Sequence, residues 1–262
     1  MPVYTAVTLP QALDSAAAAV GKALSLDPDL ADAHATRGSM MADEWRWAES
    51  EPHFLRAIEL NGGDATAHQW YGEMLVRTGR LTEAIEQLKV AEQLDPLASV
   101  IPTNLGWAYL SAGREEDALA AFRAVIDFNP RHVQGHVGVG YVLLDRRRFS
   151  EAITALEKAV ELANGQRSTR AHLARGYAIA GRRSDAMRIF AELKGDVQRG
   201  GGSPWGVALV AMSLGLEDEA FRWLELAYQR REIGIGYLKA THAFKALRSD
   251  ERFTGLLKRM GL

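Results

Sequence analysis

The stretch GRLTEAIEQLKVAEQLDP, residues 79–96, decides how the rest of the chain is interpreted. Its apolar residues recur every three or four positions, which predicts one amphipathic helix, and its last residue, proline, predicts where that helix stops. Close copies follow: GREEDALAAFRAVIDFNP at 113–130 and RRFSEAITALEKAVELAN at 147–164. A segment that returns at a constant spacing indicates a repeat protein built from stacked units.

The spacing is 34 residues, and six windows of that length cover residues 31–234 without insertion. The eighth position of each window is small: Gly38, Gly72, Gly106, Gly140, Ala174, Ala208. The twentieth position is also small: Ser50, Ala84, Ala118, Ala152, Ala186, Ala220. The twenty-fourth is large and apolar: Phe54, Leu88, Phe122, Leu156, Phe190, Leu224. Helices that cross closely need small residues at the crossing, so each window is predicted to form an antiparallel helix pair.

Turn and stop residues place the ends of these helices. Position 15 is glycine in four windows: Gly79, Gly113, Gly181, Gly215. Position 32 holds Gly62, Pro96, Pro130 or Asn164 in the first four windows. Second helices are therefore predicted to end near Leu60, Leu94, Phe128 and Leu162. Trp45 replaces the turn glycine in the first window, and the last two windows lack the stop proline.

These patterns predict an all-α solenoid in which six helix pairs stack into a right-handed superhelix. Stacking neighbours completes one continuous core and leaves an extended concave surface formed by the first helices. Residues 1–30 are predicted to be an N-terminal capping helix, over about 11–26, or a half repeat of a longer protein. Residues 235–262 are predicted to form a C-terminal cap that includes Phe253, Leu256 and Leu257.

The 34-residue pattern resembles the tetratricopeptide repeat, abbreviated TPR. Longer stretches, including WRWAESEPHFLRAIELN and FKALRSDERFTGLLKRMGL, are similar to the C-terminal TPR region of bacterial multi-domain regulators. In those regulators a winged-helix, serine/threonine kinase or nucleotide cyclase domain precedes the repeats. The resemblance implies a sensor or protein-interaction module, and it leaves open that this chain is a fragment of a transcriptional regulator.

Composition narrows the other possibilities. The 262 residues are 47% hydrophobic and 24% charged, with a net charge of −2, as in an ordinary globular protein. No cysteine is present, so disulfides and thiolate metal sites are excluded. We recognise no signal peptide and no apolar stretch long enough to span a membrane, so the cytoplasm is the expected location.

Catalytic chemistry is not indicated by any cluster of residues. His132 and His136 have the spacing of two metal ligands, but no third ligand accompanies them. The glycine-rich stretches at 135–141 and 199–206 match no phosphate-binding motif. We therefore predict no catalytic residue, no cofactor, no metal site and no enzymatic activity.

The TPR resemblance implies that certain positions of each first helix face the concave groove. On this basis the candidate partner-binding residues are Trp70, Glu73, Arg77, Asn104, Trp107, Tyr141, Asp145 and Arg175. Trp107 and Tyr141 occupy position 9 of consecutive windows, so they are expected side by side, between Arg77 and Arg175. We expect the core not to need these two rings, although Trp70 and Trp107 could instead pack between repeats. The superfamily's best-known pattern for clamping a terminal carboxylate is absent.

Three functional classes follow in order of support. The first is a protein-interaction or regulatory module that binds a peptide or partner helix in the concave groove. The second is a nucleic-acid binder that uses the arginines of 167–200, a segment with 8 basic and 3 acidic side chains. The third is an enzyme. The expected partner is thus a protein or peptide, without a membrane, and the oligomeric state stays open.

Overall fold

The structure, a computed structural model, describes residues 9–262, with side chains from Asp14 onward. Every regular element in this range is helical. The α-helices are α1 (Leu9–Leu26), α2 (Ala31–Asp43), α3 (Trp47–Leu60), α4 (Ala65–Thr78), α5 (Leu81–Leu94), α6 (Val100–Ser111), α7 (Glu115–Phe128), α8 (Val133–Asp145), α9 (Phe149–Leu162), α10 (Arg167–Ile179), α11 (Arg183–Gln198), α12 (Pro204–Ser213), α13 (Glu217–Gln229) and α14 (Glu251–Arg259). Two 3₁₀ helices, η1 (Ile233–Tyr237) and η2 (His242–Ser249), precede α14.

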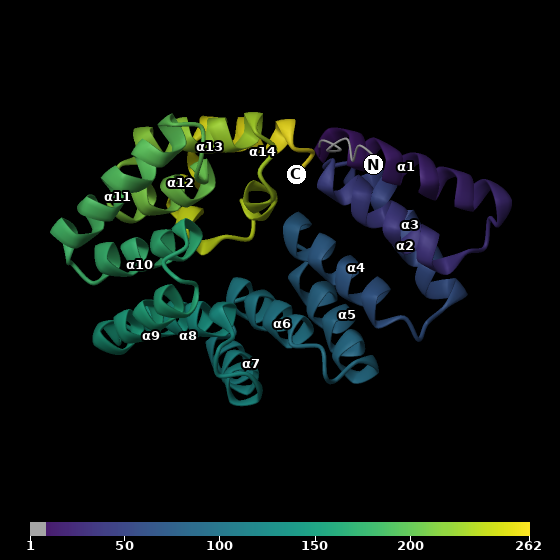
Figure 1. Cartoon of the computed structure of the whole chain (residues 1–262), viewed down its shortest axis with the longest axis horizontal. Coiled ribbons are helices and arrows are strands. Elements are labelled where there is room, and N and C mark those ends of the chain that lie inside the picture. Colours follow the sequence, from purple (N-terminus) through teal and green to yellow (C-terminus); the bar gives the residue numbers. More distant parts are fainter. Residues whose placement is uncertain (1–8) are drawn as a thin grey trace, which may run out of the picture.

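Helices α2–α13 form six pairs that stack in chain order, which confirms the predicted all-α solenoid (Figure 1). The predicted ends of the second helices at Leu60, Leu94, Phe128 and Leu162 are confirmed. The predicted N-terminal helix is α1, which packs on α2. The part of segment 1–30 that precedes Leu9 lies outside the described residues.

The small residues at position 8 lie where two helices of a pair nearly touch. A Cβ atom added to Gly72 would sit 2.7 Å from Leu88 Cγ, and one added to Gly106 would sit 2.7 Å from Phe122 Cε1. Leu88 and Phe122 are fully buried knobs at position 24. The small residue at position 8, packed against the large residue at position 24, therefore sets the spacing of the two helices within each pair.

The turn inside each pair needs a left-handed residue at position 15, where glycine has no steric cost. The four predicted turn glycines all have positive φ, between 73° and 84°. Trp45 and Arg147 occupy the same position in the first and fourth windows, with φ of 62° and 58°. The geometry of the turn is thus kept even where the sequence lacks glycine.

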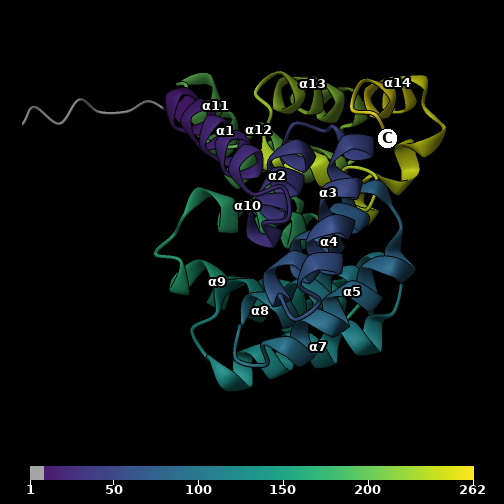
Figure 2. The same cartoon turned by 90° about the vertical axis from the view of Figure 1, so that its right-hand side faces the viewer.

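The solenoid curves until its two ends meet (Figure 1). Trp47 Nε1, at the start of α3, donates a hydrogen bond to the Met260 carbonyl at 2.6 Å, although 213 residues separate them. Trp45 stacks on Tyr228 of α13, with ring centroids 5.2 Å apart. Figure 2 shows α14 and the C-terminus beside α3 in a second view. The described chain is therefore a nearly closed ring.

The C-terminal segment does more than the predicted cap. Phe253 and Leu256 are buried and Leu257 is partly buried against the last helix pair, as expected of a cap. Residues 233–243, however, run into the interior of the ring and contact α4 and α12. The concave surface is consequently not the open, extended groove that the repeat pattern predicted.

Candidate binding cavity

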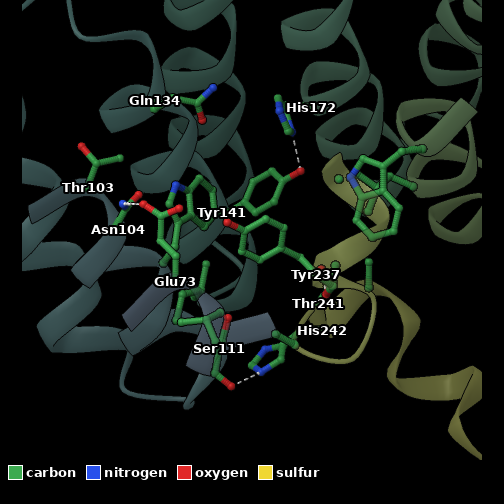
Figure 3. Close-up of a pocket in the computed structure, with 18 of the residues that line it drawn as sticks. Glu73, Thr103, Asn104, Ser111, Gln134, Tyr141, His172, Tyr237, Thr241 and His242 are labelled. Atoms are coloured by element: carbon green, nitrogen blue, oxygen red, sulfur yellow. Dashed lines mark hydrogen bonds between the residues drawn. The ribbon is translucent and has the colours of Figure 1, made fainter. Parts of the chain in front are cut away.

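A cavity of about 460 Å³ lies inside the ring. The first helices α4, α6, α8, α10 and α12 form its wall, and the segment that contains η1 and the start of η2 lines another side of it (Figure 3). Six of the eight candidate groove residues line it: Glu73, Asn104, Trp107, Tyr141, Asp145 and Arg175. Position 9 of the second to sixth windows lines the cavity, so residues far apart in the sequence meet here.

Trp107 and Tyr141 lie side by side in this wall. Their rings meet edge to face with centroids 5.5 Å apart. Arg175 continues the row, with its guanidinium carbon 4.2 Å from the centroid of the Tyr141 ring. Position 9 therefore presents an acid, two aromatic rings and a cation on the first helices of four consecutive windows. The acid is Glu73 on α4, and the cation is Arg175 on α10.

Hydrogen bonds order Glu73 and Tyr141, the first and third residues of this row. Asn104 Nδ2 and Gln69 Nε2 donate to the Glu73 carboxylate at 2.5 Å and 2.9 Å. The Tyr141 hydroxyl and His172 Nδ1 share a hydrogen bond of 2.6 Å (Figure 3). Burial, helped by the charge of Arg175, lowers the pKa of His172 to about 4, so its imidazole is neutral at pH 7.

Arg175 differs from the other polar residues of the wall. Its relative exposure is 7%. Among the described residues, its Nε and Nη1 atoms have no hydrogen-bond partner. A buried guanidinium normally has its donors paired, so this charge is only partly compensated inside the protein.

Two candidate residues lie outside the cavity lining. Arg77 is 8% exposed, donates to Asp43 at 2.7 Å, and stacks on Tyr237 of η1 with its guanidinium carbon 5.0 Å from the ring centroid. Trp70 is partly buried against Ala35, Ala57 and Ala67. Arg77 thus fixes the C-terminal segment, and Trp70 packs between repeats, as the structural alternative anticipated.

The expectation that the core does not need the two rings is wrong for Trp107. Its ring also meets the fully buried Phe122 edge to face, at a centroid distance of 5.0 Å. Both Trp107 and Tyr141 pack partly buried against the core clusters. Truncating either ring will therefore lower stability as well as change the cavity wall.

The sequence interpretation missed Trp205, Tyr237 and His242, all of which line the cavity. Trp205 is at position 5 of the sixth window, one of the first-helix positions that the TPR resemblance assigns to the groove, so extending the candidate set to that window would have found it. Tyr237 and His242 lie beyond the repeats, where no periodic signal exists. His242 Nε2 bonds the Ser111 carbonyl at 2.9 Å, which ties η2 to the end of α6 (Figure 3).

The basic segment 167–200 offers little free charge. Six of its eight cationic side chains pair with carboxylates: Arg167, Arg170, Arg182, Arg188, Lys194 and Arg199. Arg183 donates to the Leu214 carbonyl, and Arg175 is the buried residue described above. The geometry gives no specific support to nucleic-acid binding.

Residues 9–262 offer neither a metal site nor a membrane span. No group of three or more histidine, aspartate or glutamate side chains is arranged to hold a metal ion in that range. No helix there combines the length and apolarity that crossing a bilayer requires.

The fold and the lined concave cavity define a helix-pair solenoid of the TPR class. Residues 45–99, 103–167 and 140–198 match the family model for the tetratricopeptide repeat, and together they cover more than half of the chain. This chain belongs to the tetratricopeptide repeat family. Proteins of this family are generally protein-interaction scaffolds.

Solved structures share this fold. A tetratricopeptide repeat protein from Parabacteroides merdae ATCC 43184 is 14% identical, with a TM-score of 0.68 and coverage of 95% of this chain and 93% of its own. YrrB, described as a TPR protein with an unusual peptide-binding site, is 15% identical, with a TM-score of 0.50 and coverage of 78% and 96%. At these identities the likeness shows the fold alone.

Curated relatives share only part of their length with this chain. The anaphase-promoting complex subunit CDC16 of Saccharomyces cerevisiae (strain ATCC 204508 / S288c) is 28% identical over 120 residues, 43% of this chain and 14% of that protein. Protein O-mannosyl-transferase TMTC3 of Homo sapiens is 25% identical over 179 residues, 66% of this chain and 19% of that protein. The chain spans less than a fifth of either relative, whose named roles belong to the whole proteins.

Proposed function

We propose that this chain is a protein-interaction module of regulatory type that holds a segment of a partner protein at its concave face. The proposed contact residues are Glu73, Asn104, Trp107, Tyr141, Asp145 and Arg175, which line one cavity. Aromatic and arginine side chains gathered in a partly desolvated pocket are the residues that most often anchor protein interfaces.

One observation carries the proposal: the concave face already holds a peptide segment of its own chain. Residues 233–243 cross it without α-helical structure. Tyr237 stacks on Arg77, and His242 bonds the Ser111 carbonyl. A surface that accommodates one such segment through stacking and hydrogen bonds has the chemistry to accommodate a second beside it. The peptide-binding site named for YrrB supports the same mode for this fold.

The test begins with the purified chain as bait, to identify a partner by mass spectrometry. The partner's affinity is then measured for Trp107→Ala/Tyr141→Ala and for a control, Phe128→Ala, which truncates an aromatic ring that is 67% exposed at the end of α7. We expect the double variant to lose about 2 kcal/mol of affinity per anchoring ring, and the control to lose little.

The packing of Trp107 on Phe122 requires one precaution. All affinities are measured at a temperature where circular dichroism shows every variant folded. If the folded double variant binds the partner as tightly as Phe128→Ala does, the proposed contact surface is wrong.

A further inference from the structure

The cavity also has features of a small-molecule site, and these centre on Arg175. This side chain lines the cavity, is 7% exposed, and leaves Nε and Nη1 without hydrogen-bond partners among the described residues. Removing a cation from water without pairing it is unfavourable, because the surrounding low dielectric does not stabilise its charge. Nε and Nη1 are themselves enclosed by protein atoms, so an anion in the cavity would act on the guanidinium as a nearby opposite charge and through the part of the side chain that lines the cavity.

The charged and titratable groups around Arg175 leave its charge only partly compensated. Asp145 is the carboxylate that acts on Arg175 through space, but it leaves Nε and Nη1 of Arg175 without a hydrogen bond, and burial raises the pKa of its own carboxyl. The carboxylate of Glu73, on α4, already accepts hydrogen bonds from Asn104 and Gln69. His172 and Tyr141 are neutral at pH 7, and each has its pKa shifted in that sense by burial. His242 bonds the Ser111 carbonyl across the cavity.

The rest of the wall suits a flat apolar body. Trp107, Tyr141, Trp205 and Tyr237 contribute aromatic side chains from four different elements. The volume of about 460 Å³ falls in the range of small-ligand pockets, roughly 300–1,000 Å³. Such pockets typically combine apolar walls with a few polar groups that fix the ligand's orientation.

We propose that this cavity binds a small organic carboxylate with a flat aromatic body, paired with Arg175 and held between the aromatic side chains. The carboxylate neutralises the guanidinium, and the aromatic body fills the space between Trp107, Trp205 and Tyr237. This inference does not depend on the proposed partner. The cavity alone would bind a small carboxylate, whether or not a partner segment contacts the concave face.

The test uses three aromatic carboxylates, benzoate, phenylacetate and 2-naphthoate, each compared with its own carboxamide by isothermal titration calorimetry. The members of each pair have nearly the same shape and differ in charge. For wild type we expect at least one carboxylate to bind with a Kd at least tenfold lower than its carboxamide. Equal affinities within every pair, or no binding of any carboxylate up to millimolar concentration, would overturn the proposal.

Variants locate the site. Arg175→Gln is expected to abolish the preference for carboxylate, and Arg175→Lys, which keeps the charge, to retain part of it. The matched control is Arg182→Gln, because Arg182 stacks on Tyr177 at the same 4.2 Å but lies exposed, outside the cavity lining. It should behave as wild type. A preference that survives in Arg175→Gln would place the carboxylate elsewhere and overturn the assignment.

A second measurement separates a ligand-binding role from a structural one. If Arg175 is retained for a ligand, the ligand-free Arg175→Gln variant should melt at the wild-type temperature or above it, since a poorly compensated charge is removed. Melting several degrees lower, together with no carboxylate preference in wild type, would show that Arg175 only supports Tyr141. If the variant does not fold, the wild-type comparison of carboxylate and carboxamide decides alone.

Discussion

The two middle helix pairs, α6–α9, and the contact between the first pair and the C-terminal segment are held by different kinds of interaction. In the middle pairs, buried residues such as Ala118, Phe122 and Leu156 meet neighbours within one or two windows. At the ring closure, Trp47 bonds Met260 across 213 residues, and Trp45 stacks on Tyr228.

One repeat position can therefore serve two purposes. Position 15 is a turn throughout the array, but in the first window its occupant, Trp45, also joins two core clusters at the closure. Local rules describe the middle of the array well. At the closure they compete with contacts that only the complete ring provides.

The largest predicted effect tests the local rule. Ala84→Leu, Ala118→Leu and Ala152→Leu should each destabilise the protein by about 1–3 kcal/mol, because each alanine is completely buried where the paired helices cross. Urea denaturation measures the change. The control is Ala120→Leu on the exposed face of α7, which should change stability by less than about 0.5 kcal/mol. Near-neutral results for all three buried sites would contradict the repeat register.

The second prediction concerns the cavity, which α6, α8, α10 and residues 234–243 help to line. The folded-state pKa of His172 is about 4, below its value of about 6.5 in the unfolded chain. Between these values the unfolded chain binds the extra proton, so stability should fall as the pH falls from about 6.5 to about 4. The loss should be roughly 1–3 kcal/mol.

His172→Gln should remove that part of the acid sensitivity, as judged by urea midpoints at pH 7 and pH 4.5. Tyr141→Phe is the control, because it removes the hydrogen bond of 2.6 Å but keeps the imidazole buried near Arg175. The same pH dependence in wild type and His172→Gln would show that the imidazole is solvated.

The smallest predicted effects set the two regions directly against each other. Trp45 and Arg147 share position 15 and a left-handed backbone. Arg147→Gly should stabilise the protein by about 1 kcal/mol, since Arg147 is exposed and the change only relieves backbone strain. Trp45→Gly should destabilise it by about 1 kcal/mol, because the lost ring packing outweighs the same relief. Thermal denaturation would contradict this contrast if both variants shifted in the same direction.

Most of the helix-pair array could be predicted from the sequence. Its determinants, such as Gly72 against Leu88, recur every 34 residues, so six copies of the same signal reinforce each other. The course of residues 233–243 could not be predicted. Tyr237 and His242 dock on side chains and carbonyls more than 100 residues away, and such pairings leave no periodic trace.

The candidate site likewise has a part that the repeat pattern predicted and a part that it did not. The alignment of Trp107 with Tyr141 followed from their shared position in consecutive windows, and their rings do meet. The narrowing of the groove into a cavity did not follow from the sequence, because it depends on the C-terminal segment. The burial of Arg77 was missed for this reason too, since Tyr237 covers it.

The meeting of the two ends also changes where the array opens. In an open solenoid the outermost units have a neighbour on one side only, so their amides exchange with solvent first. Here Trp45 of the first pair stacks on Tyr228 of the last pair, and Trp47 donates to the Met260 carbonyl of the C-terminal cap, so neither end can detach without breaking contacts of the other. The amides of the first and last helix pairs should therefore be protected from exchange together, because the same contacts hold both ends.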